Sequence, residues 1–278
     1  MSVMPTFKIT LAYDGTDYVG WQRQANGVSI QELIEDALRA LDGRHVTLTG
    51  ASRTDAGVHA LGQVAAFTIA RELEPDALVR ALNAHLPHAV RVLAAEEAPP
   101  AFHPRFEARA KTYRYRLWHD DVMSPFERAY AWHVPGPLDV EAMRNAARLL
   151  EGRHDFAAFQ ATGSSVTTTE REVAVSRIFT LRIADCGLRI REESTIESAI
   201  QNPQSALLVY EITGTGFLRH MVRIIVGSLV EIGRGRQPVE WIGGVIASRD
   251  RASAGPTAPP HGLFLVRVEY PGALAAGS

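Results

Sequence analysis

The sequence predicts a globular α+β protein on three observations. Stretches in which apolar and polar residues alternate, as they do in strands, are interleaved with stretches of helical periodicity. Of the 278 residues, 46% are hydrophobic and 22% are charged, which is typical of folded domains rather than of disordered chains. The longest apolar stretch, at 217–233, contains Arg219, His220 and Arg223 and is not expected to span a membrane. The N-terminal residues lack the pattern of a signal peptide, so we expect a cytoplasmic protein.

The first half of the chain is expected to form one α+β unit. Apolar residues at every second position predict a strand at 7–13. Ser29, with Glu32 three residues later, forms a capping box that opens a helix ending at Gly43. Further elements are expected as a strand at 45–49, a strand at 62–67, a helix that starts at Pro75 and a strand near 90–95.

The second half is expected to order strands and helices in a similar way. The patterns predict strands at 109–118, 172–184, 206–213 and 263–269, and helices at 139–150 (capped by Asp139), 217–233 and 238–248. The polar segment 185–205 is interpreted as a long hairpin tip. Three prolines in the segment 94–104 oppose regular structure. We therefore place the join there and expect an N-terminal part, 1–104, and a C-terminal part, 105–278.

Charge and cysteine usage exclude several classes of protein. With 29 Lys and Arg against 31 Asp and Glu, the net charge is −2, so no overall basic excess points to nucleic acid. A local basic patch can still bind RNA on such a surface. The single cysteine, Cys186, excludes an internal disulfide framework and the cysteine-rich zinc site of nucleobase deaminases.

The densest candidate site is the segment 50–63, GASRTDAGVHALGQ, between two expected strands. It places Asp55 two residues after Arg53, on one face of an extended segment. A neighbouring cation favours the ionised carboxylate, which is then available as a nucleophile or base. Asp-Ala-Gly is also ordinary turn chemistry, so the pattern alone leaves a purely structural loop open.

A second cluster, from Phe102 to Arg116, combines cations and aromatic rings. Lys111, Tyr113 and Tyr115 share one strand face, and arginines alternate with them. Interleaved rings and cations suit unpaired nucleotides, because bases stack on rings and phosphates bind cations. A strand with its tyrosines packed in a core fits the residue types equally well.

A third cluster lies at 214–227, GTGFLRHMVRIIVG. Gly214 and Gly216 precede the expected helix, where a tight turn is the simpler interpretation and phosphate binding the alternative. Arg219 and Arg223 are four residues apart, which predicts one helix face, in a segment apolar enough to be buried. Buried arginines require an anion, either a carboxylate or a phosphate.

Weaker patterns suggest other chemistry. Asp14, Asp17, Asp55 and His59 could together imitate a site for a hard metal ion, but nothing in the sequence fixes their geometry. His154 and Asp155 are expected to pack at a helix end, since no serine or cysteine is placed to complete a hydrolase triad.

Motifs along the whole chain resemble one family. The segment S-R-T-D-A-G-V-H-A-x-G-Q-V resembles the catalytic motif of the TruA-type tRNA pseudouridine synthases, the tRNA pseudouridine(38-40) synthase family. Further similar motifs follow in family order: Y-D-G-x-x-Y-x-G-W-Q at 13–22, F-H-P-R-F at 102–106, K-T-Y-R-Y at 111–115, D-F-x-x-F at 155–159, G-F-L-R-H-M-V-R at 216–223 and G-L-F-L at 262–265. The chain departs from the pattern at Ser52, where glycine is frequent, and in the longer segment 185–205.

The resemblance implies roles for individual residues. Asp55 corresponds to the catalytic aspartate, a nucleophile that acts on a flipped-out uridine, and Tyr113 to the tyrosine that stacks on the target base. Arg53 corresponds to the arginine that helps to hold the flipped nucleotide, and Arg223 to the basic residue that pairs with the aspartate. From the basic clusters we add the substrate-binding candidates Arg105, Arg114 and Arg219.

The resemblance also implies a fold and an activity. The expected pseudouridine synthase fold has two similar α/β halves that form one extended mixed, mainly antiparallel sheet with flanking helices and a central cleft. The N-terminal half would carry the aspartate loop, and the C-terminal half the basic strand and the arginine-bearing helix. Family members are homodimers that bind tRNA with both subunits, without a metal or cofactor. They isomerise uridine to pseudouridine at positions 38, 39 and 40, in the anticodon stem and loop.

Two other functions remain alternatives at this point. One is a non-catalytic tRNA-binding protein that uses the basic segments 102–116 and 219–236. The other is a metal-dependent phosphoesterase built on the acidic residues and His59. The pairing of Arg53 with Asp55 argues against both, because neither binding nor chelation requires it.

Overall fold

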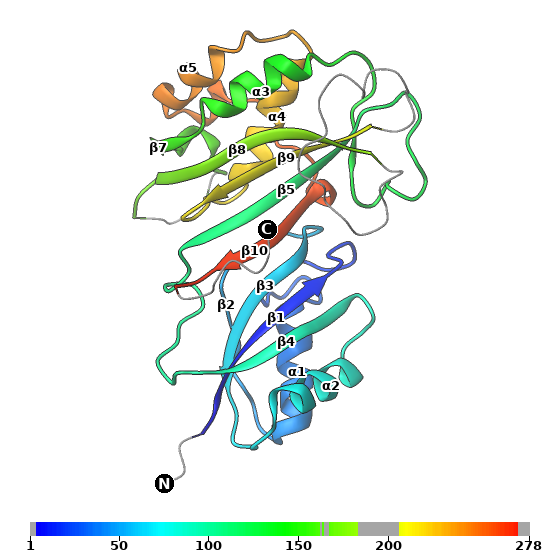
Figure 1. Cartoon of the computed structure of the whole chain (residues 1–278), viewed down its shortest axis with the longest axis vertical. Coiled ribbons are helices and arrows are strands. Elements are labelled where there is room, and N and C mark those ends of the chain that lie inside the picture. The colour runs from blue at the N-terminus through cyan, green and yellow to red at the C-terminus, as the bar shows by residue number, and fades with distance from the viewer. Residues whose placement is uncertain (1–3, 162, 164–166, 183–205, 272–278) are drawn as a thin grey trace. The chain divides into compact units, whose positions relative to one another are not determined.

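A computed structural model describes residues 4–161, 163, 167–182 and 206–271 (Figure 1). Cys186 and the expected hairpin tip at 185–205 lie outside the described residues. The described elements are β1 (Thr6–Tyr13), α1 (Ile30–Asp42), β2 (Thr49–Gly50), β3 (His59–Thr68), α2 (Pro75–His85), β4 (Val90–Ala98), β5 (Ala110–Trp118), β6 (Trp132–His133), α3 (Val140–Arg148), β7 (Gly152–Asp155), β8 (Glu170–Arg182), β9 (Ala206–Gly214), α4 (Met221–Gly233), α5 (Trp241–Ser248) and β10 (Leu263–Glu269). Short 3₁₀ helices lie at Ala157–Phe159, Arg251–Ser253 and Pro260–Gly262.

The strands are hydrogen-bonded in the order β4-β1-β3-β10-β5-β9-β8-β7, with β2 beside β3 and β6 beside β5. Neighbours such as β1 and β3 or β7 and β8 are antiparallel, whereas β10 runs parallel to β3. The prediction of an α+β fold with a mixed, mainly antiparallel sheet and flanking helices is therefore confirmed.

The chain divides into two compact units. The first unit comprises Met1–Tyr113, Gly214–Gly216 and Phe264–Ser278, and the second comprises Arg114–Thr213 and Phe217–Leu263. The division falls inside β5, in the strand that follows the expected join at 94–104. Because β10 returns to the first unit, that unit is assembled from both ends of the chain.

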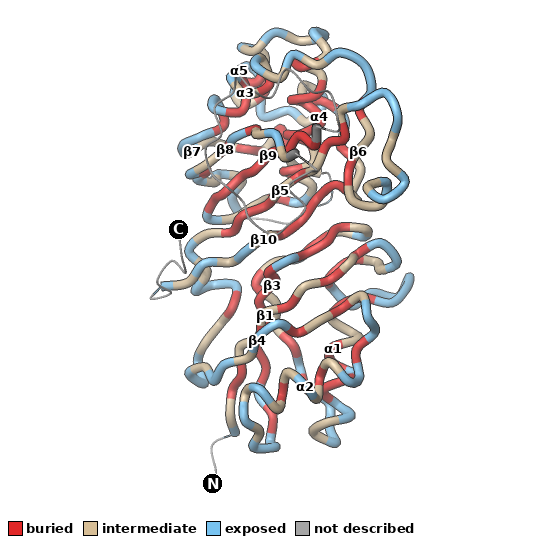
Figure 2. The backbone as a smooth tube through the Cα atoms, turned by 45° about the vertical axis from the view of Figure 1, so that its right-hand side comes forward, coloured by how far each residue is buried: buried red, intermediate tan, exposed pale blue. Residues whose placement is uncertain are grey.

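In the first unit, α1 and α2 contact each other and α2 packs against β4 (Figure 1). The start of α1 is fixed as the sequence predicts, since Ser29 Oγ accepts a hydrogen bond from Glu32 N and the carboxylate of Glu32 accepts one from Ser29 N. Gly43 ends the helix with a φ of 73°, a conformation that favours glycine. The apolar face of the helix, including Ile30, Ile34 and Leu38, is fully buried, as Figure 2 shows for the inner side of the unit.

In the second unit, α3 packs against both α4 and β8. Asp139 caps α3 as expected, because its carboxylate accepts a hydrogen bond of 2.8 Å from Ala142 N. Most residues of α4 are buried, so this helix is the centre of the unit's core. His154 and Asp155, expected to pack at a helix end, instead belong to the short strand β7. The Asp155 carboxylate accepts hydrogen bonds from Ala157 N and Thr169 Oγ1.

Two expected elements are wrong in extent. The strand expected at 45–49 is reduced to β2, because side chains of α1 replace a strand partner at Leu48. Glu35 accepts from Leu48 N, and Gln31 donates to Leu48 O. The helix expected at 217–233 begins only at Met221, since His220 has a left-handed φ of 61° that interrupts helical geometry.

Candidate active site

The loop that carries Asp55 lies between β2 and β3 in the first unit, and backbone and side-chain bonds hold it on both sides. Ala51 N donates to Val64 O over 2.8 Å. The side chain of Gln63, fully buried on β3, clamps Ser52 twice, since Nε2 donates to Ser52 O over 2.6 Å and Oε1 accepts from Ser52 N over 3.3 Å. A buried amide with its partners satisfied makes a rigid support, because breaking either bond leaves a buried polar group unpaired.

The motif at 13–22 supports the same loop from below. Tyr13 OH lies 2.8 Å from Thr54 Oγ1, and Trp21 N donates to Thr54 O over 3.0 Å. Gly20 has a φ of 104°, and a Cβ at this position would lie 2.5 Å from Thr54 O. The glycine is therefore required for the close approach of the two segments. The motif at 13–22 and the motif that contains Asp55 thus contact each other and form one structural unit.

The far end of the loop is fixed by His59, the first residue of β3, which is only 1% exposed. Gly15 N donates to His59 Nδ1 over 3.0 Å, and the Asp14 carboxylate lies 3.1 Å from the same nitrogen. The imidazole stacks on the Phe264 ring at 4.6 Å. Two residues of the alternative metal site, Asp14 and His59, thus serve the folding of this loop. The described residues contain no group of three His, Cys, Asp or Glu side chains arranged to hold a metal ion.

Tyr113 on β5 meets the Asp55 loop directly. Its hydroxyl oxygen lies 2.8 Å from Ser52 Oγ, and the neighbouring Lys111 donates from Nζ to Ala51 O over 2.7 Å. Burial raises the pKa of Tyr113 to about 12, with the negative charge of Asp55 adding to the effect and the bond to Ser52 opposing it. The phenol is consequently neutral near pH 7, and the carboxylate of Asp55 is close enough to act on it.

Asp55 and Arg53 differ in exposure. The side chain of Arg53 is exposed, and among the residues that the structure describes it makes no hydrogen bond or ion pair, including none with Asp55. Asp55 is half-buried, and its carbonyl oxygen accepts from Val58 N over 3.1 Å in the turn. The expected pairing of Arg53 with Asp55 is therefore not observed among the described residues, because the guanidinium is exposed to solvent, where it is available for an external anion.

Arg223 and Arg219 lie in the second unit and do not share a helix face. Arg223 is half-buried on the first turn of α4, and its Nε donates to Ala258 O over 2.7 Å. Arg219 lies before the helix, in the turn ended by the left-handed His220, and its side chain is exposed. The expectation that both are buried on one helix face is wrong because the helix starts two residues after Arg219.

Arg114, also in the second unit, is bound within the protein. Its Nε donates over 2.7 Å to the carboxylate of Glu211, which is 3% exposed, and Arg177 binds the other carboxylate oxygen at 2.9 Å. Burial by itself raises the pKa of Glu211, but the hydrogen bonds and charges of the two arginines outweigh it and hold the pKa below its ordinary value. The position fits a core ion pair at least as well as a substrate contact.

Several residues inside the motif that begins at Ser52 have contacts that the sequence does not predict. Ser52 has no expected function in the turn, yet it bonds Tyr113, and Gln63 and Thr54 act through long-range contacts. The alternation of β5 does indicate that Tyr113 and Lys111 share one face, and both side chains are buried as that pattern predicts. Only the pairing of β5 with its neighbours, which the sequence does not state, brings them to the loop.

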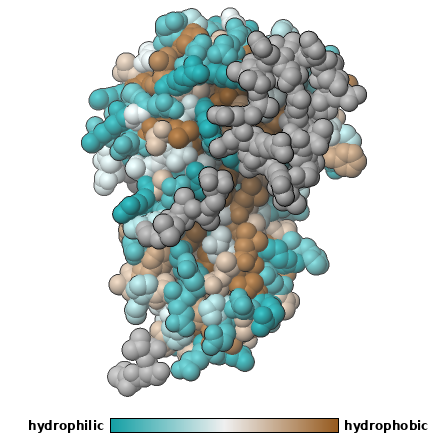
Figure 3. All heavy atoms as spheres, viewed as in Figure 1, coloured by the Kyte–Doolittle hydropathy of each residue, from teal (hydrophilic) through white to brown (hydrophobic). Residues whose placement is uncertain are grey.

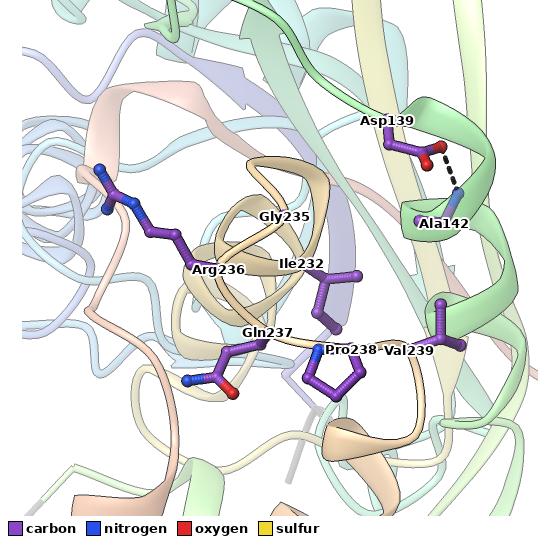
Figure 4. Close-up of a pocket in the computed structure, with 8 residues that line it drawn as sticks. All are labelled: Asp139, Ala142, Ile232, Gly235, Arg236, Gln237, Pro238 and Val239. Atoms are coloured by element: carbon purple, nitrogen blue, oxygen red, sulfur yellow. Dashed lines mark hydrogen bonds between the residues drawn. The ribbon is translucent and has the colours of Figure 1, made fainter.

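Other surfaces do not compete with this site. A depression of about 430 Å³ in the second unit is lined by residues such as Asp139, Arg236 and Pro238, which are labelled in Figure 4. It contains none of the expected site residues, and its charged groups already have partners, Ala142 N for Asp139 and Glu231 for Arg236. On the described part of the face in Figure 3, hydrophilic and hydrophobic residues are intermixed. No described helix is long and apolar enough to cross a membrane.

Comparison with known proteins agrees with this geometry. A sequence profile of the family described as tRNA pseudouridine synthase matches residues 9–107 and 146–271, which include the Asp55 loop and α4. The chain belongs to the tRNA pseudouridine synthase family. A protein of Myxococcus xanthus called tRNA pseudouridine synthase A is 45% identical over 267 residues, which are 96% of this chain and 92% of that protein. Proteins of the same name from Geobacter sulfurreducens and Solibacter usitatus are 44% and 45% identical and are covered completely, with 96% of this chain aligned in each case.

Membership of the tRNA pseudouridine synthase family confirms the resemblance that the motifs indicate. Pseudouridine synthases are isomerases, so the predicted enzyme class is confirmed as well. The phosphoesterase interpretation is thereby set aside. The matched region begins at residue 9 and therefore includes the motif at 13–22, which contacts the Asp55 loop through Thr54.

Proposed function

We propose that this protein isomerises uridine to pseudouridine in tRNA, at positions 38, 39 and 40 of the anticodon stem and loop, with Asp55 as the catalytic nucleophile. The observation that carries the proposal is the proximity of Asp55 and Tyr113: their segments are bonded through Ser52, and the negative charge of Asp55 adds to the burial that raises the pKa of Tyr113. The similar proteins are called tRNA pseudouridine synthase A, and this name supports tRNA as the substrate. The positions within the anticodon arm rest on the motif resemblance.

The reaction needs a carboxylate and no change of redox state. The bond between N1 and C1′ breaks, a bond between C5 and C1′ forms, the C5 proton leaves and N1 gains a proton. Asp55 is supplied on a loop that contacts of Gln63 with Ser52 and of Tyr13 with Thr54 support, so the segment that carries the carboxylate is held in place before substrate arrives. Such preorganisation lowers the barrier because little reorganisation is left to the reaction itself.

The target base has to leave its stack, which costs a few kcal/mol. Stacking on Tyr113 offsets about 1–3 kcal/mol of this. Because the Tyr113 ring is buried in the free protein, the flipped base has to replace neighbours that now cover the ring. The exposed guanidinium of Arg53 is free to bind a phosphate of the flipped nucleotide.

Further residues are proposed with separate roles. Arg223 is proposed to serve the catalytic carboxylate, on its motif match and its position at the start of α4. Arg105 and Arg219 are exposed and suited to phosphate contacts, whereas a contact from Arg114 competes with its bond to Glu211. We also propose that the protein is cytoplasmic and forms a homodimer. Sedimentation would measure the oligomeric state.

Mapping of pseudouridine in an unmodified tRNA transcript tests the proposal. The wild type should convert uridines of the anticodon arm in the presence of a chelator, and Asp55→Ala should convert none while it still binds the transcript. Binding without conversion by the wild type would instead support a non-catalytic tRNA-binding protein. Conversion outside positions 38–40 would leave the activity standing and overturn the proposed target.

A further inference from the structure

The segment between β4 and β5 presents an aromatic ring to solvent. Phe106 is 75% exposed, whereas Phe102 in the same segment is half-buried. Single exposed apolar residues are common, so exposure alone indicates no function. The informative feature is that the ring is exposed on a rigid support, entirely within the first unit.

Hydrogen bonds hold the tip of this turn. His103 Nδ1 accepts from Arg105 N over 3.2 Å and from Phe106 N over 3.4 Å. The carboxylate of Glu107 accepts from His103 N over 2.7 Å, and Glu107 N donates to His103 O over 3.1 Å. The backbone that carries Phe106 therefore has few alternative conformations.

The base of the turn is tied to the strands. Tyr270 OH donates to Pro104 O over 2.7 Å, and its ring lies 5.4 Å from that of Phe102. Lys8 Nζ lies 4.7 Å from the centre of the Tyr270 ring, and Arg109 N donates to the carbonyl of Glu269 over 2.8 Å. The turn is consequently fixed to β1 and β10, so that the exposed ring is placed by the sheet.

The exposed tip combines a ring with a cation. The guanidinium carbon of Arg105 lies 5.7 Å from the centre of the Phe106 ring, and the imidazole of His103 lies 4.1 Å from it. Arg105 is itself exposed, and no carboxylate pairs with it among the described residues. A preordered ring beside an available cation matches an unpaired nucleotide, whose base stacks and whose phosphate binds arginine.

We propose that Phe106 is a stacking platform for an unpaired base of the RNA substrate, and that Arg105 binds the adjoining phosphate. The proposal rests on the proposed function, because it names a second contact on the same RNA. Along β5, Ala110 and Tyr113 are about 10 Å apart at the usual rise of a strand, and the turn lies beyond Ala110. We assign Phe106 to a nucleotide other than the one at Asp55, since the ring lies on a separate turn before β5.

Affinity for an unmodified tRNA transcript, measured in an Asp55→Ala background, tests the platform without interference from turnover. Phe106→Ala should weaken binding roughly 5- to 150-fold, the factor that corresponds to about 1–3 kcal/mol per stacked base. Phe106→Trp should retain affinity within about threefold, because it keeps a stacking surface. Phe126→Ala is the matched control, since Phe126 is 86% exposed but lies in the second unit. The affinity of this variant for the transcript should not change.

The phosphate contact has its own readout. Arg105→Ala should reduce the slope of log affinity against log salt by about 0.7–0.9, the value for one phosphate. An unchanged slope would overturn the role of Arg105. Equal losses of affinity for Phe106→Ala and Phe126→Ala would overturn the platform, because any exposed ring would then behave alike.

A second copy of this chain is the alternative binding partner of Phe106. Sedimentation of the free protein distinguishes a subunit contact from RNA binding. If Phe106→Ala dissociates an oligomer of the free protein, the ring is a subunit contact and the proposal fails. Unchanged affinity together with unchanged assembly also overturns it. Should the wild type convert uridine while Phe106→Ala binds normally, only this inference fails. Should the wild type convert none while Phe106→Ala still loses affinity, the proposed function fails and the platform stands.

Discussion

The hydroxyl groups of Ser52 and Tyr113 lie 2.8 Å apart and join the Asp55 loop to β5. Ser52 is three residues before Asp55 and is itself clamped by Gln63, so one short chain of bonds relates the carboxylate loop to the ring. Breaking this contact changes the orientation of the ring without removing either the carboxylate or the aromatic face.

We expect Ser52→Ala to reduce kcat about 3- to 10-fold and stability by about 1–3 kcal/mol, because the buried Tyr113 hydroxyl loses a partner. Single-turnover rates and urea unfolding measure the two effects, and Ser52→Thr, which keeps the hydroxyl, should restore most of the rate. In a Tyr113→Phe background the effect of Ser52→Ala should shrink. Full additivity of the two substitutions would show that the hydrogen bond has no role.

Tyr113 predicts a loss of stability at alkaline pH. Its pKa is raised from 10.0 to about 12 in the folded protein, so the fold favours the protonated phenol. The stabilisation is complete below pH 10 and is lost as the pH rises from 10 through 12. The free energy of unfolding of the wild type, relative to Tyr113→Phe, should fall across this window. A difference that stays constant would contradict a buried, protonated Tyr113.

A side chain in place of Gly20 is expected to strain the backbone at residue 20 and to displace the Asp55 loop. A Cβ at its φ of 104° would lie 2.5 Å from Thr54 O and 2.9 Å from the carbonyl carbon of Asp55. Gly20→Ala should lower kcat at least tenfold. Gly43→Ala is the control, because Gly43 also has a positive φ, of 73°, but open space around it, and should cost only about 1 kcal/mol of stability. Equal kcat values for Gly20→Ala and Gly43→Ala would contradict the conclusion that the close approach at Gly20 positions the Asp55 loop.

Arg114→Ala is expected to act mainly on stability, since it leaves the buried Glu211 with Arg177 alone. The loss should be about 1–3 kcal/mol near pH 7. Because the folded-state pKa of Glu211 is lowered, its stabilisation is present above the unfolded pKa and disappears as the pH falls through the folded value. The difference between wild type and variant should therefore narrow in acid. A reduced salt slope of tRNA binding would instead support the substrate contact predicted from the sequence.

The sequence predicts local elements of this fold well where one interaction decides them. The capping box of Ser29 and Glu32 and the cap of α3 at Asp139 involve neighbours in the chain, and both are observed. The strand at 45–49 is mispredicted because Gln31 and Glu35 of α1 bind the backbone of Leu48. Periodicity cannot register a competing side chain from another element.

The same distinction applies to the candidate site. The sequence identifies the Asp55 loop and the Tyr113 strand as separate clusters, because each has a local pattern of charge, glycine or ring. Their joining through Ser52 and the support of Thr54 by Tyr13 depend on long-range strand pairing. The shared helix face of Arg219 and Arg223 fails because the left-handed His220 shortens α4, and a local conformation of this kind leaves no mark in the periodicity.

The most direct test of the account is release of tritium from tRNA that carries [5-³H]uridine, under single-turnover conditions, with wild type and Asp55→Asn compared. Every conversion loses the C5 hydrogen, so release reports the chemistry itself. The account predicts stoichiometric release by the wild type, and no release by Asp55→Asn at tRNA concentrations that saturate its binding. Release by Asp55→Asn at a rate near that of the wild type would contradict the central role of the carboxylate.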